Sequence, residues 1–261
     1  MTALALPALG SFSAPDDWQA IDFISDLHLA ADTPLGFEVW SHYMRGTRAE
    51  AVFILGDLFE VWVGDDARHE GFEALCAEVL RDAAAARTVA FMAGNRDFLV
   101  GAHMLSACNM SALCDPTVVT AFGERLLLTH GDALCLADTG YQSFRTMVRS
   151  PAWQASVLAR PLAERRALAR EVRHESERRH GTMQPEWLDL DLAASVEWMR
   201  AADARVLVHG HTHRPASQVL QPGFTRHVLS DWALDHAAPP RADVLRWSRE
   251  GLRRIAPEDA G

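Results

Sequence analysis

Cysteine and tyrosine are scarce in this chain of 261 residues, which contains four cysteines and two tyrosines. The cysteines form no C-x-x-C pair, so they predict no disulfide framework, and a reducing cytosol is the expected compartment. No apolar run approaches the roughly 20 residues that span a bilayer, so we expect any membrane contact to be peripheral. Positive charge is also lacking: the formal net charge is −10, which argues against general nucleic-acid binding. The twelve histidines point instead to metal or acid–base chemistry.

Length and composition are those of a globular protein. A chain of this length suits one large domain or a domain with an insertion, and 49% hydrophobic with 23% charged residues excludes an intrinsically disordered chain. The first residues have no basic n-region, and Pro7 and Gly10 interrupt their short apolar part. We therefore expect residues 1–20 to be a disordered leader rather than a signal peptide.

Five short apolar runs, each followed by a polar or glycine-containing turn, predict the core. Such runs are typical of buried strands, and the apolar spacing over residues 72–80 predicts a helix between two of them. The fold class is therefore α/β, in which ligands gather beyond the carboxyl ends of the strands. The runs are Ile21–Ile24, Ala51–Leu55, Val89–Ala93, Leu126–Leu128 and Val206–Val208.

Residues 141–184 break this pattern, because they contain no strand-like run. They carry nine arginines and four glutamates, a local charge of +5 in an acidic chain. Apolar pairs at i, i+4 and two prolines predict short helices. We interpret the segment as a helical cap inserted in a core of residues 21–140 and 185–250, with 251–261 as a tail. The alternative is a solvated helical hairpin without a role.

Polar residues with ligand chemistry follow each apolar run. Oxygen and imidazole donors without thiolates suit Mn²⁺, Fe or Zn²⁺, and i, i+2 spacing lets two side chains face the same way. Seven donors exceed the need of one ion, so we expect two ions that share a carboxylate, an arrangement that clamps both oxygens of a phosphoryl displacement. The candidates are Asp26, His28, Asp57, Asn95, His130, His211 and His213.

Each of these short motifs alone is more often a simple turn, but their order is informative. The succession D-x-H, G-D, G-N-R-D, H and G-H-x-H resembles that of the calcineurin-like metallophosphoesterase superfamily. The resemblance implies a two-sheet α/β sandwich with an inserted helical cap and two metal ions at the strand ends. It assigns Asp26, His28, Asp57 and His213 to one ion. It assigns Asp57, Asn95, His130 and His211 to the other, with Asp57 as the bridge.

Longer stretches of the sequence resemble one family within this superfamily. Residues 55–66, 94–98, 130–135, 141–145 and 210–215 are similar to the UDP-2,3-diacylglucosamine diphosphatase family of lipid A biosynthesis, and the similarity runs from about Ile21 to Leu245. Members hydrolyse the pyrophosphate bond to give UMP and 2,3-diacylglucosamine 1-phosphate. The resemblance implies two divalent ions, with Mn²⁺ expected, and hydroxide attack at the α-phosphorus. It also implies a UDP-linked diacylated glucosamine substrate and a peripheral place on the cytoplasmic face of the inner membrane, and the negative net charge predicts no nucleic-acid partner. It leaves the oligomeric state open.

The same resemblance supplies candidate substrate contacts. Asn95, Arg96 and His211 are expected to be catalytic by stabilising charge on the phosphoryl oxygens. His180 and Met183 stand where the best-known members have Asn and Lys. The full set of substrate contacts is Asn95, Arg96, Asp138, Tyr141, Phe144, Arg173, Ser176, His180, Met183 and His211.

Two other functions stay open at this point. A nucleotide pyrophosphatase or phosphodiesterase would share the metal site, but a soluble nucleotide needs no apolar cap. A non-catalytic scaffold would share the fold, but the presence of all seven candidate ligands argues against it. Asp97 and Asp132 are expected either to orient metal-bound imidazoles or to serve turn chemistry.

Overall fold

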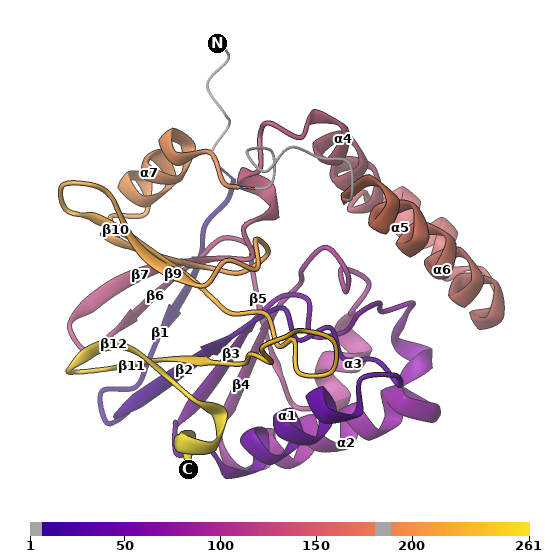
Figure 1. The fold of residues 1–261 in the computed structure, drawn as a ribbon, viewed down its shortest axis with the longest axis horizontal. Coiled ribbons are helices and arrows are strands. Elements are labelled where there is room, and N and C mark those ends of the chain that lie inside the picture. The colour runs from indigo at the N-terminus through magenta and orange to yellow at the C-terminus, as the bar shows by residue number, and fades with distance from the viewer. Residues whose placement is uncertain (1–6, 181–188) are drawn as a thin grey trace.

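Two central β-sheets, covered by helices on their outer faces, form four layers in this computed structural model (Figure 1). The structure describes residues 7–180 and 189–261 and, between 172 and 180, the backbone alone. The first sheet has the order β1-β6-β7-β8-β10-β9. Its strands are β1 (Gly10–Ser13), β6 (Thr117–Ala121), β7 (Glu124–Thr129), β8 (Val206–His209), β9 (Ala216–Gln221) and β10 (Phe224–Val228).

The second sheet has the order β12-β11-β2-β3-β4-β5, and β2 to β5 run parallel. Its strands are β2 (Ala20–Ile24), β3 (Ala51–Leu55), β4 (Thr88–Met92), β5 (Ser111–Leu113), β11 (Val244–Ser248) and β12 (Gly251–Ile255). The helices are α1 (Pro34–Gly46), α2 (Gly71–Ala86), α3 (Ala102–Ala107), α4 (Thr139–Val148), α5 (Pro151–Leu158), α6 (Leu162–His180) and α7 (Leu192–Ala201), with short 3-10 turns at Asp65–His69, Asp132–Leu134 and Pro257–Ala260.

The core strands are buried on both faces, which explains why the sequence shows them as continuous apolar runs. Along β3, Phe53 packs between the two sheets against residues such as Leu128. Its neighbours Val52 and Ile54 point the other way, to the layer of α1 and α2. Helix α7 covers the outer face of the first sheet with Trp198. Burial of one such side chain contributes roughly 1.5–3 kcal/mol, so the sheets hold the strand ends firmly in place.

Three helices occupy the stretch expected to form the cap. Helix α4 begins after Asp138, whose side chain accepts a hydrogen bond from the backbone N–H of Tyr141, and α5 begins with Pro151 after Ser150, whose hydroxyl accepts from the N–H of Trp153. These are the preferred residue types for a helix start. Figure 1 shows α4, α5 and α6 together along one side of the molecule.

The expectations for the two termini need correction. Residues 10–13 are not disordered, because they form β1, which pairs in parallel with β6. Phe12 packs edge-on against Phe53 with 5.0 Å between ring centroids. The strand has only four residues with alternating exposure, a pattern too short to predict a strand from the sequence. Residues 251–261 are not a tail, because they form β12 and a 3-10 turn whose Ala260 carbonyl accepts from the N–H of Arg48. Within the described residues, no helix has both the length and the apolar character needed to cross a membrane.

Candidate metal centre and the base of the cap

The candidate ligands converge where the two sheets meet. Asp26 and His28 follow β2, Asp57 follows β3, and Asn95 follows β4. Strands β7 and β8, in the other sheet, lead to His130 and to the pair His211 and His213. These strands run parallel within each sheet, so their carboxyl ends meet at one edge, as the sequence predicts.

Five of the seven candidates have a left-handed backbone, which is uncommon outside glycine. Their φ angles lie between 49° and 68° for Asp26, His28, Asp57, His211 and His213. A residue held in such a conformation costs of order 1–3 kcal/mol, and this strain tends to gather at functional sites. Hydrogen bonds offset part of that cost here. The N–H of Asp26 donates to the carbonyl of Gly56 at 3.1 Å, and that of His28 donates to the carbonyl of Asp57 at 3.0 Å.

The first cluster of donor atoms belongs to Asp26, His28 and His213, whose ligand atoms all lie within 4.8 Å of one another. Nε2 of His28 is 3.2 Å from Nε2 of His213, which in turn is 3.4 Å from Oδ1 of Asp26. Two imidazoles and a carboxylate are a common donor set for a divalent ion. This cluster matches three of the four residues assigned to the first ion.

The second cluster combines Asp26, Asp57 and His130 within the same 4.8 Å limit. Oδ1 of Asn95 joins it, 2.9 Å from Nε2 of His130 and 2.8 Å from Nδ1 of His211. Asp26 thus belongs to both clusters, whereas the resemblance gives the bridging role to Asp57. The role of Asp57 as the bridge stays a prediction.

Two glycines let the backbone approach these carboxylates. A Cβ atom on Gly94 would lie 2.1 Å from Oδ1 of Asp57, and one on Gly210 would lie 2.4 Å from Oδ2 of Asp26. Both distances are far below van der Waals contact. Any side chain at either position would therefore displace a candidate ligand.

The charges of the site fit a cation. Asp26 and Asp57 are almost fully buried, and a buried carboxylate is costly unless a positive charge compensates it. Burial alone lowers the pKa of His130, but the carboxylates of Asp57, Asp132 and Asp26 raise it to about 9. Burial, together with the charge on His130, lowers the pKa of His211 to about 3. Metal ions can replace the proton on His130, because imidazole ligates in its neutral form.

Comparisons with known proteins show the family of this chain. The calcineurin-like phosphoesterase family matches residues 20–215. The chain belongs to this family. Among its relatives, a UDP-2,3-diacylglucosamine hydrolase of Chromobacterium violaceum is 46% identical over 82% of this chain and 90% of its own length. A protein of the same name from Bordetella pertussis is 42% identical over 88% and 92%. Among solved structures, the phosphoesterase Yfce from E. coli aligns with a TM-score of 0.45 and 18% identity, over 93% of this chain and 95% of its own.

The expected substrate residues of this phosphoesterase divide into three groups. Arg96 lies at the site, because its backbone N–H donates to Oδ1 of Asp57 at 2.8 Å. Tyr141, on α4, lies with its ring centroid 6.0 Å from that of His211, and Phe144 is half-buried on the same helix. Asp138 caps α4, as described above. The side chains of Arg173, Ser176 and His180 on α6, and the whole of Met183, lie outside the described residues.

The sequence did not indicate how α4 is attached to the site. The buried carboxylate of Asp132 accepts from the hydroxyl of Tyr141 at 2.7 Å, from Nε of Arg145 at 2.8 Å and from Nη2 of Arg149 at 3.4 Å. Nη2 of Arg149 also donates to the carbonyl of Gly94 at 3.0 Å. Asp132 therefore anchors α4. The only available signal was the i, i+4 spacing of Arg145 on α4 and Arg149 just after it.

Asp97 serves turn chemistry, one of the two roles left open for it. Its Oδ2 accepts from the N–H of Leu58 and its Oδ1 from that of Gly94, both at 2.8 Å. Asp97 thereby joins the loops that follow β3 and β4. No imidazole of the described residues donates to Asp97 or Asp132 within hydrogen-bonding distance.

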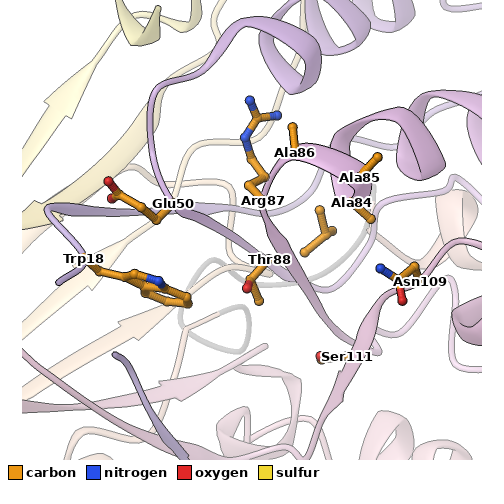
Figure 2. Close-up of a pocket in the computed structure, with 10 residues that line it drawn as sticks. Trp18, Glu50, Ala84, Ala85, Ala86, Arg87, Thr88, Asn109 and Ser111 are labelled. Atoms are coloured by element: carbon orange, nitrogen blue, oxygen red, sulfur yellow. The ribbon is translucent and has the colours of Figure 1, made fainter. Parts of the chain in front are cut away.

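A hollow of about 540 Å³ lies at the opposite edge of the second sheet, where β3, β4 and β5 begin (Figure 2). Its two charged side chains have structural partners. Glu50 accepts from the N–H groups of Gln19 and Ala20, and Arg87 donates to the carbonyl of Thr47 at 2.8 Å. It contains no candidate site residue, so we assign the chemistry to the other edge of the sheet.

Proposed function

We propose that this phosphoesterase hydrolyses the pyrophosphate bond of UDP-2,3-diacylglucosamine, with UMP and 2,3-diacylglucosamine 1-phosphate as products. The convergence of seven oxygen and imidazole donors beside Arg96 is the observation that carries the proposal. The substrate is taken from the relatives, which are 41–46% identical over more than 80% of this chain and are named for hydrolysis of that molecule.

The donor clusters would hold two divalent ions, and Mn²⁺ is the ion we expect. Asp26, His28, Asp57 and His213 would hold one ion, and Asp57, Asn95, His130 and His211 the other. When bound, such ions supply Lewis acidity and lower the pKa of a coordinated water toward neutrality. The oxygen and nitrogen donors and the two buried carboxylates support the binding of divalent ions at this place.

The chain's own residues would stabilise the charge that develops on the phosphoryl oxygens. Arg96 carries a permanent charge and can bind two phosphate oxygens at once. Asn95 and His211, whose side chains are 2.8 Å apart, would present further polar atoms on the same side. Arg96 cannot act as a general acid near neutral pH. A sugar phosphate needs none, because it leaves as a weakly basic anion, with attack at the α-phosphorus.

The cap would bind the acyl chains and bring the enzyme to the cytoplasmic face of the inner membrane. Trp153 of α5 lies against Phe98, 5.9 Å between ring centroids, and Phe98 follows the site loop that contains Arg96. Leu158, at the end of α5, is 43% exposed, and such a side chain is available to an acyl chain. The surplus arginines of the cap would meet anionic head groups at about 1 kcal/mol each.

One experiment tests the proposal. The purified protein is incubated with UDP-2,3-diacylglucosamine and MnCl₂ in water enriched in ¹⁸O, and the masses of the products are measured by mass spectrometry. We expect UMP that carries the label, because attack at the α-phosphorus places the new oxygen there. Unlabelled UMP with labelled sugar phosphate would contradict attack at that atom. Equal cleavage of UDP-N-acetylglucosamine would favour a general nucleotide pyrophosphatase, and absence of any product would favour a scaffold.

A further inference from the structure

Glu60 lies between two groups that the proposed function requires. Its Oε2 is 2.9 Å from Nδ1 of His28, and its Oε1 is 3.6 Å from Nη1 of Arg96. The side chain is 15% exposed, so water screens its charge only in part. One carboxylate therefore touches a candidate metal ligand and a candidate phosphate-binding residue.

The backbone around Glu60 is tied to the loops on both sides of it. The N–H of Glu60 donates to the carbonyl of Leu29 at 3.1 Å, and the N–H of Leu29 donates to the carbonyl of Leu58 at 2.9 Å. On the other side, the N–H of Trp62 donates to the carbonyl of Arg96 at 3.2 Å. The segment that follows β3 is thus joined to the loops that follow β2 and β4. This limits how far the carboxylate can move from either partner.

The contact with His28 bears on how that imidazole can bind a metal. A histidine ligates through one nitrogen, and the partner of the other nitrogen decides which of them carries the proton. Oε2 of Glu60 is 2.9 Å from Nδ1, so its negative charge favours a proton on that nitrogen and leaves the lone pair of Nε2 available. Nε2 is the atom that faces the site, 3.2 Å from Nε2 of His213 and 4.0 Å from Oδ2 of Asp57. A carboxylate in this position also makes the imidazole a more basic ligand.

We propose that Glu60 is a positioning residue that holds His28 with Nε2 toward the metal centre and, through its other oxygen, restrains the guanidinium of Arg96. The inference rests on the proposed function, because it takes His28 as a metal ligand and Arg96 as a phosphate-binding residue. It goes further, because one carboxylate then supports both metal binding by His28 and phosphate binding by Arg96. Loss of this carboxylate therefore weakens both.

The first measurement follows the metal alone. MnCl₂ is titrated by calorimetry into protein stripped with a chelator, as wild type, Glu60→Gln and Glu38→Gln. Glu38 is exposed on α1, so its variant matches the change in charge away from the site. We expect the wild type and Glu38→Gln to bind alike and Glu60→Gln to bind at least one ion about 10–100-fold more weakly, as observed when such outer partners are removed.

The second measurement follows the substrate at saturating MnCl₂. A merely structural role of Glu60 would change kcat and KM alike in every background. We expect Glu60→Gln to raise KM in the wild-type background and to raise it less in an Arg96→Ala background, because the restrained guanidinium is then absent. Circular dichroism checks that each variant is folded. If Glu60→Gln is not, Glu60→Asp keeps the charge on a shorter side chain that cannot reach both partners, and the same losses are expected.

The outcomes separate this inference from the proposed function. A Glu60→Gln protein that binds Mn²⁺ as tightly as Glu38→Gln overturns the positioning role while the metal centre stands. If Glu60→Gln raises KM equally in the wild-type and Arg96→Ala backgrounds, Glu60 does not act through Arg96. A wild type that binds no Mn²⁺ refutes the metal centre itself, and the role of Glu60 with it.

Discussion

Replacement of Asp132 by asparagine tests how firmly the cap is attached. The side chain of Asp132 is fully buried, and its Oδ2 accepts from Tyr141, Arg145 and Arg149 of α4 or its end. Asparagine has almost the same shape but no charge, so it offers one neutral acceptor to three donors. The two arginines, whose side chains are 21% and 22% exposed, would lose their closest counter-charge.

The size of the effect follows from this geometry. Removal of one partner from a buried ion pair costs about 3–5 kcal/mol. Two features reduce the cost here, because water reaches the arginines and Asp115 remains 3.7 Å from Nη2 of Arg145. We therefore expect a loss of about 2–4 kcal/mol in the free energy of unfolding. In a protein of this size that lowers Tm by roughly 5–12 °C.

Thermal unfolding followed by circular dichroism, in a chelator so that metal plays no part, measures the loss. Asp203→Asn is the matched control, because Asp203 is 86% exposed and pairs with Arg125 at 3.4 Å, and an exposed pair contributes at most about 1 kcal/mol. Hydrogen exchange should also quicken in α4 of Asp132→Asn. If the two variants melt within about 1 °C of each other, the carboxylate does not hold the cap, and the reasoning is wrong.

Three further predictions concern single side chains. Asp57→Asn should lose at least one bound Mn²⁺ and nearly all turnover while it stays folded, because a neutral amide bridges two ions poorly; metal analysis with circular dichroism checks this, and near-normal activity contradicts it. Arg96→His should slow cleavage of a diphosphate more than that of an alkyl phosphodiester, since imidazolium can protonate an alkoxide; a wild type that cleaves both equally fast refutes the reasoning. Although burial opposes it, the guanidinium of Arg226 lowers the pKa of Asp189, so this pair stabilises the fold above the ordinary pKa near 4 and loses its effect as pH falls through the lower, folded value. The difference in free energy of unfolding between wild type and Asp189→Asn should therefore be largest at neutral pH and shrink below about pH 4. Urea unfolding across this pH range measures it, and a difference that does not change with pH would contradict the prediction.

The central strands could be predicted from the sequence because they are buried on both faces. Ala51–Leu55 is apolar throughout, and Ile21–Ile24 is apolar except for Asp22, which is buried; β3 and β2 lie there. The outer strands leave no such pattern. β9 (Ala216–Gln221) is largely exposed, and only its pairing with β10 makes it a strand.

The same contrast holds for the candidate site. The seven donors could be collected from the sequence because each directly follows a strand, and parallel strands bring their ends together. The contacts of Glu60 and Asp132 could not be predicted in this way. They join loops and helices that are distant along the chain, such as Asp132 with Gly94 through Arg149. No periodic pattern in the sequence indicates such long-range contacts.

The position of the donors at the junction of the two sheets has a mechanical consequence. Asp26 and His211 are 185 residues apart and follow strands of different sheets, yet the N–H of His211 donates to Oδ1 of Asp26 at 3.1 Å. Ions bound there would link the two sheets. A change in the apolar layer that separates the sheets, at Phe53 for example, would shift one half of the donors against the other. Packing far from the site would thus change the spacing of the donor atoms.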